Sequence, residues 1–166
     1  MTYSIVYSNP DGNTKLLADV IYNNLDKSSI TYFGLPCEEA LRADIIFIGF
    51  WTNRGMCDDV CKEFLARLSY QRIVLFGSAG FGLSDDYFHE ILAETEKLLP
   101  NGVDVLDTFM CQGRMKMSVR EKYLLQKELN PNNPKIDMMI KNFDMALKHP
   151  DSNDLLALKN MVIRVR

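Results

Sequence analysis

An apolar run stops at a polar turn near the start of the chain, and a helical pattern follows at once. Residues 5–7 are Ile-Val-Tyr, and residues 8–14 are Ser-Asn-Pro-Asp-Gly-Asn-Thr. A strand, a tight turn and a helix N-terminus bring together unpaired backbone N–H groups and the positive end of the helix dipole. The segment therefore predicts the first βα unit of an open parallel sheet, with an anion site in the turn. An ordinary βα turn without a ligand is the alternative.

The rest of the chain alternates short apolar runs with segments of helical periodicity. The run Ile-Ile-Phe-Ile at 45–48 is apolar at every position, which is typical of a strand covered on both faces. We expect strands at 2–7, 30–33, 44–50, 72–77 and 103–111, and helices at 13–25, 56–68 and 84–99. Because helices follow the strands without a long linker, the pattern predicts an α/β fold. Its five-stranded sheet is parallel and doubly wound, with helices on both faces.

Length and composition limit the classes of protein to which this chain can belong. Its 166 residues fit a single domain, 1–166, and its longest apolar runs are too short to cross a bilayer, so we expect no membrane partner. The formal net charge of -3 argues against a nucleic-acid partner, which needs a basic face. The four cysteines have no metal-binding spacing, and no secretory signal precedes the first strand. We therefore expect free thiols, no metal site and a cytoplasmic protein.

The region after the fifth strand is longer than a five-stranded sheet needs. We divide the chain into a core, 1–129, and a helical C-terminal extension, 130–166, and expect helices at 116–129, 136–147 and 154–164. The extension carries apolar residues at helical spacing, so we expect it to pack across the outer helices of the sheet. A lid or a surface that binds a partner is the alternative.

Three loops are expected to meet at the carboxyl edge of the sheet, where open α/β sheets bind ligands. The first is the turn at 8–14, the second contains the only tryptophan of the chain, and the third has Phe81 between two glycines. A phosphate-binding turn with two nearby aromatic side chains suits a phosphorylated planar ring, because aromatic faces stack on such a ring. Taken separately, the two aromatic residues are ordinary packing residues. The candidate binding residues are Ser8, Asn9, Asp11, Gly12, Asn13, Thr14, Trp51, Thr52, Asn53, Arg54, Gly55, Ser78, Ala79, Gly80, Phe81 and Gly82.

These motifs resemble those of the flavodoxin family. Gly12-Asn13-Thr14 matches the family's phosphate loop, Phe50-Trp51 matches the stretch with the tryptophan beside the flavin, and Phe81 stands where the family has a second aromatic residue. The resemblance covers residues 2–113 and implies a sheet with strand order 2-1-3-4-5. It also implies bound FMN as the cofactor and electron transfer to a redox partner protein, a reductase.

Two further stretches narrow the resemblance. Phe109–Met115 and His149-Pro150-Asp151 resemble a long-tailed flavodoxin-like subgroup of anaerobic bacteria, which includes accessory proteins of bilirubin reduction. The subgroup resemblance implies an electron carrier or reductase accessory protein rather than a stand-alone enzyme.

The phosphate turn departs from the family's pattern at two positions. The family has hydroxyl side chains at the places of Asn9 and Asp11. Asn9 can donate through its amide, but an inward-pointing Asp11 carboxylate would repel a phosphate dianion. At about 5 Å this repulsion is about 3 kcal/mol, or about two orders of magnitude in affinity. Pro10 removes one backbone donor as well. Asp11 therefore points outward, weakens FMN binding, or indicates a different ligand.

Acidic side chains follow the second and third loops. Asp58, Asp59, Asp85, Asp86 and Glu90 are predicted to form a rim around the site that attracts a basic partner. A solvated helix start accounts for Asp85 and Asp86 equally well.

Three functions remain open on the sequence. The first is an FMN-binding, flavodoxin-like oxidoreductase component that delivers electrons to a partner reductase. The second is an NAD(P)H-dependent flavin reductase or quinone reductase of the same fold, although the sequence has no nucleotide fingerprint. The third is a flavin-free interaction module, which Pro10 and Asp11 favour. The sequence leaves the oligomeric state open.

Overall fold

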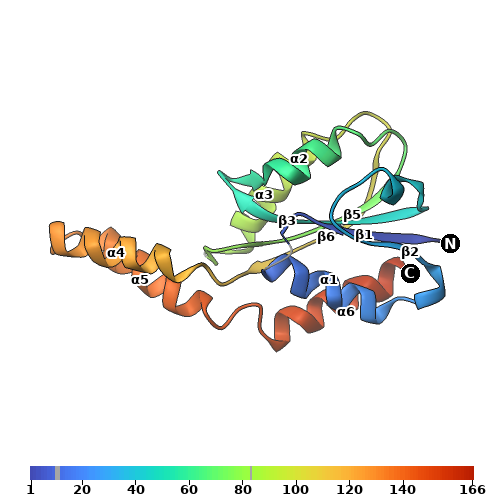
Figure 1. Ribbon diagram of the computed structural model, residues 1–166. Helices are drawn as coiled ribbons and strands as arrows, with labels where there is room; N and C mark the ends of the chain where they lie inside the picture. The colour runs from blue at the N-terminus through green and yellow to red at the C-terminus, as the bar shows by residue number, and fades with distance from the viewer. Residues whose placement is uncertain (10–11, 83) are drawn as a thin grey trace.

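Five parallel strands form the centre of the molecule, in the order β2-β1-β3-β5-β6 (Figure 1). The computed structural model describes residues 1–9, 12–82 and 84–166. Its long strands are β1 (Tyr3–Tyr7), β2 (Ile30–Gly34), β3 (Ile45–Asn53), β5 (Arg72–Ala79) and β6 (Asp104–Gln112). Numbered among these five strands alone, the order is 2-1-3-4-5. The predicted α/β fold and sheet topology are therefore confirmed.

Helices cover both faces of the sheet. α1 (Asn13–Asn24) and α6 (Ser152–Val165) lie on one face, and α2 (Asp59–Leu65) and α3 (Asp85–Glu96) lie on the other (Figure 1). The short 3-10 helices η1 (Lys27–Ser29) and η2 (Glu39–Arg42) complete the connections on either side of β2. This arrangement explains why the first six residues of β3 are all buried, since neither face of the strand meets water.

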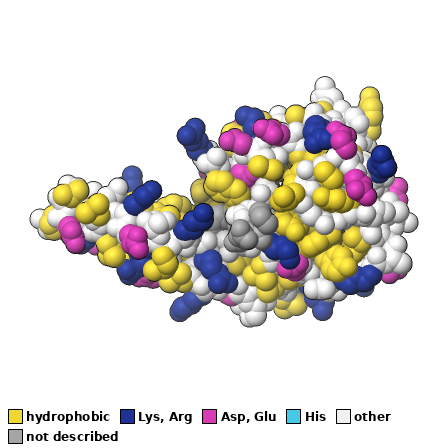
Figure 2. Space-filling model, in the orientation of Figure 1, with side chains coloured by type: hydrophobic (Ala, Val, Ile, Leu, Met, Phe, Trp, Pro, Cys, Tyr) yellow, Lys and Arg dark blue, Asp and Glu magenta, His cyan; other side chains and the backbone are white. Residues whose placement is uncertain are grey.

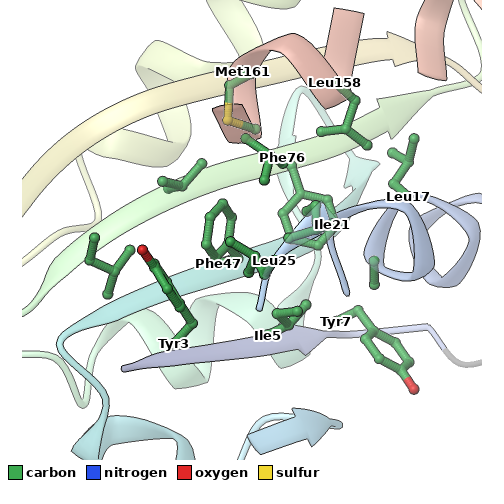
Figure 3. Close-up of a cluster of buried hydrophobic side chains, with 14 of the residues drawn as sticks. Tyr3, Ile5, Tyr7, Leu17, Ile21, Leu25, Phe47, Phe76, Leu158 and Met161 are labelled. Carbon is green, nitrogen blue, oxygen red and sulfur yellow. The ribbon is translucent and has the colours of Figure 1, made fainter. Parts of the chain in front are cut away.

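Each face of the sheet has its own apolar core. On the face covered by α1 and α6, Phe47 and Phe76 from the sheet pack with Leu17 and Leu158 from the two helices (Figure 3). The opposite core contains Phe64 of α2. Burial of one such side chain contributes about 1.5–3 kcal/mol before the loss of conformational entropy is subtracted. The C-terminal helix α6 is therefore an integral part of the body, as expected for the extension.

The segment after β3 differs from the prediction. β3 continues through Trp51, Thr52 and Asn53 and pairs antiparallel with the two-residue strand β4 (Met56–Cys57). Arg54 and Gly55 form the turn, with φ values of 52° and 80°, as a two-residue type I′ hairpin needs. The predicted strand end at 50 and the predicted helix at 56–68 are wrong, because this hairpin occupies the first part of that range. α2 starts only at Asp59.

Two helices leave the body together. α4 (Met117–Leu129) and α5 (Pro134–Ala146) form an antiparallel hairpin that projects from the sheet (Figure 1). Residues 116–148 are called the arm below. Tyr123, Ile136 and Phe143 are buried in it, and ion pairs of 2.8 Å join Arg120 to Asp144 and Lys127 to Asp137. The expectation that this part of the extension packs across the outer helices is wrong, because the apolar face of α5 packs on α4.

The length and apolar character of each helix decide whether it could cross a bilayer. Among the described ranges, none of them combines the length and the apolar character that crossing a bilayer requires.

Candidate functional site

A cleft lies at the carboxyl edge of the sheet, beside the N-terminus of α1. It consists of two adjoining cavities of about 470 and 660 Å³, whose linings share Asn9, Asn13, Trp51, Ser78, Arg114, Met115 and Lys116. Both volumes are typical of sites that bind small molecules. The smaller cavity is called the helix end of the cleft, and the larger cavity is called the aromatic end.

Residues from all three predicted loops meet in this cleft. The lining contains Asn9, Gly12, Asn13, Thr14, Trp51, Thr52, Arg54, Gly55, Ser78, Gly80 and Phe81. Four further candidates, among the residues that the structure describes, lie outside the lining. These are Ser8, whose hydroxyl donates to Asp58, Asn53 in the hairpin, Ala79 in the core, and Gly82, whose N–H donates to Asn142. Asp11 and Pro10 lie outside the described residues.

The helix end of the cleft contains groups that bind anions. The N-cap residue of α1 is Gly12, which has no side chain with which to cap the helix, and the first turn of α1 has no acidic residue. The first N–H groups of the helix and the positive end of its dipole are therefore available to a ligand. The exposed cations Arg114 and Lys116 line the same cavity. This combination suits a phosphate group.

The two cations belong to a segment that packs directly on the phosphate turn. The side-chain amide of Asn13 donates to the carbonyl oxygen of Arg114 at 3.0 Å. Gly113 lies so close to this amide that a Cβ atom at Gly113 would be 2.4 Å from Asn13 Nδ2. The Arg114 N–H donates to the carbonyl oxygen of His149 at 3.1 Å. These contacts hold the backbone at Arg114 beside the start of α1.

Sequence reasoning missed this part of the cleft. The lining residues that it did not name are Leu16, Tyr87, Gly113, Arg114, Met115, Lys116 and Val119. One signal was present, because the predicted fifth strand ends at the same edge of the sheet as the other strands. The loop after that strand therefore had to lie near the site.

The aromatic end combines flat apolar surfaces with polar side chains. Trp51 is 43% exposed, and Phe81 and Tyr87 are half-buried. Burial raises the pKa of the Tyr87 phenol, which keeps it a neutral donor at physiological pH. Met115 packs against the backbone of Gly80, where a Cβ atom would be 2.6 Å from the methionine sulfur. A planar ring suits such walls, because aromatic side chains stack on it.

The buried carboxylate of Asp58 connects the first two loops of the cleft. Asp58 is 2% exposed and accepts from the Ser8 hydroxyl at 2.5 Å, the Trp51 N–H at 3.2 Å and the Cys61 N–H at 3.1 Å. It thereby caps α2 and connects the phosphate turn to the strand that carries Trp51. The prediction that Asp58 belongs to an exposed acidic rim is wrong, because the residue turns inward to these donors. Asp59 is exposed, as are Asp85, Asp86 and Glu90.

A second group of potential ligand atoms is explained by helix capping. His149, Asp151 and Asp154 have side-chain atoms within 4.8 Å of one another. Asp151 accepts from the N–H of Asp154, and Asp154 accepts from the N–H of Asp151, which is a capping box at the start of α6. The His149 ring contacts Asp154 at 2.6 Å. These bonds account for the cluster.

Comparison with known proteins decides the family. A family model described as a flavodoxin domain matches residues 4–163, almost the whole chain. The chain belongs to the flavodoxin family. This flavodoxin-like protein is 34% identical to the "Flavodoxin-like domain-containing protein BilS" of Clostridium symbiosum, and the match covers 98% of this chain and 95% of that protein. It is 29% identical to the protein of the same name from Clostridioides difficile, over 96% of both chains.

Solved structures agree on the fold. The oxidised Flavodoxin 2 of Bacillus cereus superposes with a TM-score of 0.55 and 18% identity, and the match covers 98% of this chain and 96% of that chain. A flavoprotein of Lactobacillus acidophilus, solved in complex with FMN, superposes with a TM-score of 0.50 and 13% identity. That match covers 66% of this chain and 92% of the flavoprotein.

Proposed function

We propose that this flavodoxin-like protein binds FMN in the cleft and transfers electrons to a partner reductase. The observation that carries the proposal is the shared cleft, which has the start of α1 at one end and Phe81 at the other, and in which Trp51, Arg114 and Lys116 line both cavities. The FMN complex of the Lactobacillus acidophilus flavoprotein, which has the same fold, supports this choice of cofactor.

The residues at the helix end fit the phosphate of FMN. Asn13 and Thr14 stand in the first turn of α1, where a helix dipole stabilises an anion by about 0.3–1 kcal/mol at an exposed site. Arg114 and Lys116 add two positive charges from the other side of the same cavity. These cations offset part of the repulsion that is expected from Asp11, which lies outside the described residues.

The residues at the aromatic end fit the ring system. Trp51 and Phe81 offer apolar faces for stacking, and each aromatic contact contributes about 0.5–1.5 kcal/mol beyond the burial of area. The Thr52 hydroxyl already donates to the Ser78 carbonyl oxygen at 2.9 Å, so this pair braces the wall of the cavity. The ring would lie in the cavity of about 660 Å³.

The protein would tune electron transfer through its charges and its apolar walls. When bound, FMN supplies the one- and two-electron chemistry. The aromatic walls exclude water, and this makes negative charge on a reduced flavin less favourable. The buried Asp58 carboxylate also disfavours negative charge on the flavin, whereas the Arg54 side chain at the hairpin tip favours it. The exposed edge of Trp51 leaves a path to a partner.

Binding can be tested with the single tryptophan of the chain. FMN and riboflavin are titrated separately while the fluorescence of Trp51 is recorded. We expect both to quench it and FMN to bind about tenfold more tightly or better, because only FMN has the phosphate. Replacing both Arg114 and Lys116 by Gln should reduce this ratio, and the control Arg72→Gln, at the amino end of β5, should not. Equal affinity for the two ligands, or no quenching, contradicts the proposed site.

Electron delivery needs a separate experiment. The protein is loaded with FMN, reduced chemically and mixed with cytochrome c as a general one-electron acceptor. We expect rapid reduction of the cytochrome and no reduction of the FMN-loaded protein by NAD(P)H alone. Direct reduction by NAD(P)H would instead support a reductase, and failure to bind FMN would support a flavin-free interaction module.

A further inference from the structure

The arm exposes an unusual amount of apolar surface. It makes up about a fifth of the chain but contains half of the exposed large apolar side chains in the described ranges. These side chains are 41–73% exposed, and they are Met117, Leu124, Leu125, Leu129, Met138, Met145 and Leu147. Figure 2 shows hydrophobic side chains along the arm, beyond the outline of the body. A concentration of exposed apolar side chains in one segment is typical of a protein–protein interface.

The arm leaves the body in a defined direction. At its base the Asn142 side chain donates to the Gly80 carbonyl oxygen at 3.0 Å. The same side chain accepts from the Gln112 amide at 3.1 Å and from the Gly82 N–H at 3.5 Å. These bonds join α5 to the loop after β5 and to the last residue of β6, so the exposed helices are held in place before any partner binds.

The arm and the body carry opposite charge. The arm has seven basic and four acidic side chains, whereas the remaining residues have 12 basic and 18 acidic ones. Both acids of α5, Asp137 and Asp144, form ion pairs with Lys127 and Arg120 of α4. Met138 and Met145 lie beside Lys141 and Lys148, at helical spacings of three and seven. Asp137 and Asp144 line the same groove as Lys141, Met145 and Lys148, and the ion pairs to α4 offset their negative charges.

A complementary surface exists on the same molecule. The region 58–97, which contains α2 and α3, has seven acidic side chains besides the buried Asp58, and four basic ones. Glu63, Asp86 and Glu90 are exposed on these helices, and Val60 beside them is 48% exposed. This surface is called the acidic layer below. The arm cannot reach the acidic layer of its own chain, because it projects away from α2 and α3 (Figure 1).

We infer that the chain forms a dimer in which each arm lies on the acidic layer of the other copy. The arm base and the acidic layer flank the same cleft, which Lys116 and Val119 line from the arm and Tyr87 lines from α3. In a two-fold dimer this contact is made twice, once by each arm. Such an interface is self-complementary and closes at two copies. The inference is independent of the cofactor.

The test exchanges the charges of the two surfaces. The first variant carries Lys135→Glu, Lys141→Glu and Lys148→Glu on the arm. The second variant carries Glu63→Lys, Asp86→Lys and Glu90→Lys on the acidic layer. Sedimentation velocity of the full chain, with circular dichroism as a check on folding, should give the wild type twice the 19.1 kDa mass of one chain. Each variant alone should dimerise about tenfold more weakly or worse, since like charges then oppose each other.

The mixture of the two variants decides the matter. In a mixed dimer, the acidic arm of the first variant lies on the basic layer of the second variant. The unchanged basic arm of the second variant lies on the unchanged acidic layer of the first, so the mixed dimer should form again. The control Lys159→Glu changes an exposed lysine of α6 and should leave the dimer intact. A wild type that sediments as a single chain at every concentration overturns the inference, and the arm then serves a different protein. A dimer that survives both reversals, or variants that stay apart when mixed, also overturns it.

Discussion

Removal of the buried Asp58 carboxylate should damage both the fold and the site. The change Asp58→Ala leaves the Ser8 hydroxyl, the Trp51 N–H and the Cys61 N–H without their acceptor. Loss of the helix cap costs about 1 kcal/mol, and each further hydrogen bond to a charged group about 1.5–3 kcal/mol. Part of this loss in unfolding free energy is offset, because the variant no longer holds a charged carboxylate in a buried position. We expect a net loss of about 3 kcal/mol, or a Tm lower by about 6–12 °C.

Urea unfolding at neutral pH measures this effect. The matched control is Asp59→Ala, because Asp59 is exposed in the first turn of the same helix and should cost no more than about 0.5 kcal/mol. Equal unfolding free energies for the two variants would refute the reasoning, since Asp58 would then not hold the loops. The Asp58 variant should also bind FMN more weakly than the Asp59 variant, because the phosphate turn and the Trp51 strand lose their connection.

Four further changes test other parts of the account. Trp51→Ala should weaken FMN binding by about 1–2 kcal/mol in calorimetry, and unchanged affinity would place Trp51 away from the ring. Asp11→Thr should tighten FMN binding at neutral pH by removing a charge near the phosphate, whereas an unmoved affinity would show that the carboxylate points outward. A chain cut after residue 130 lacks α6, which contributes Leu158 and Val162 to the core. Calorimetry should therefore show a Tm lower by many degrees, and an unchanged Tm would contradict this packing. The N–H of Asp154 lowers the pKa of Asp151 below its usual 3.8, so this carboxylate stabilises the fold above that pH, and the contribution is lost as the pH falls through the lowered value. Asp151→Asn should therefore show a smaller loss of Tm than the wild type on acidification below 3.8, and parallel curves would argue against the cap.

The sheet could be predicted because burial on both faces leaves a plain signal in the sequence. Runs such as 45–48 are apolar at every position, and this pattern has few explanations besides a central strand. The hairpin at Arg54–Gly55 left a weak signal, because only one of its two positive-φ positions is a glycine. The predicted helix therefore began too early.

The arm shows a different limit of sequence patterns. The spacing of Met139, Ile140, Phe143 and Leu147 correctly indicated a helix in which Phe143 is buried, but Leu147 is 43% exposed. Periodicity does not say what covers the buried face of the helix, and α4 covers it instead of the body. Arg114 and Lys116 were not predicted as site residues for a related reason. The order of strands in the sheet brings the turn that contains them to the site, and no local motif in the sequence marks that turn.

The visible absorption spectrum of the purified protein, before and after addition of FMN, tests the central claim most directly. We expect flavin bands that stay with the protein through gel filtration, at one FMN per chain, together with quenched Trp51 fluorescence. A protein that remains colourless after incubation with excess FMN and gel filtration, with its tryptophan fluorescence unchanged, would contradict the proposed cofactor site.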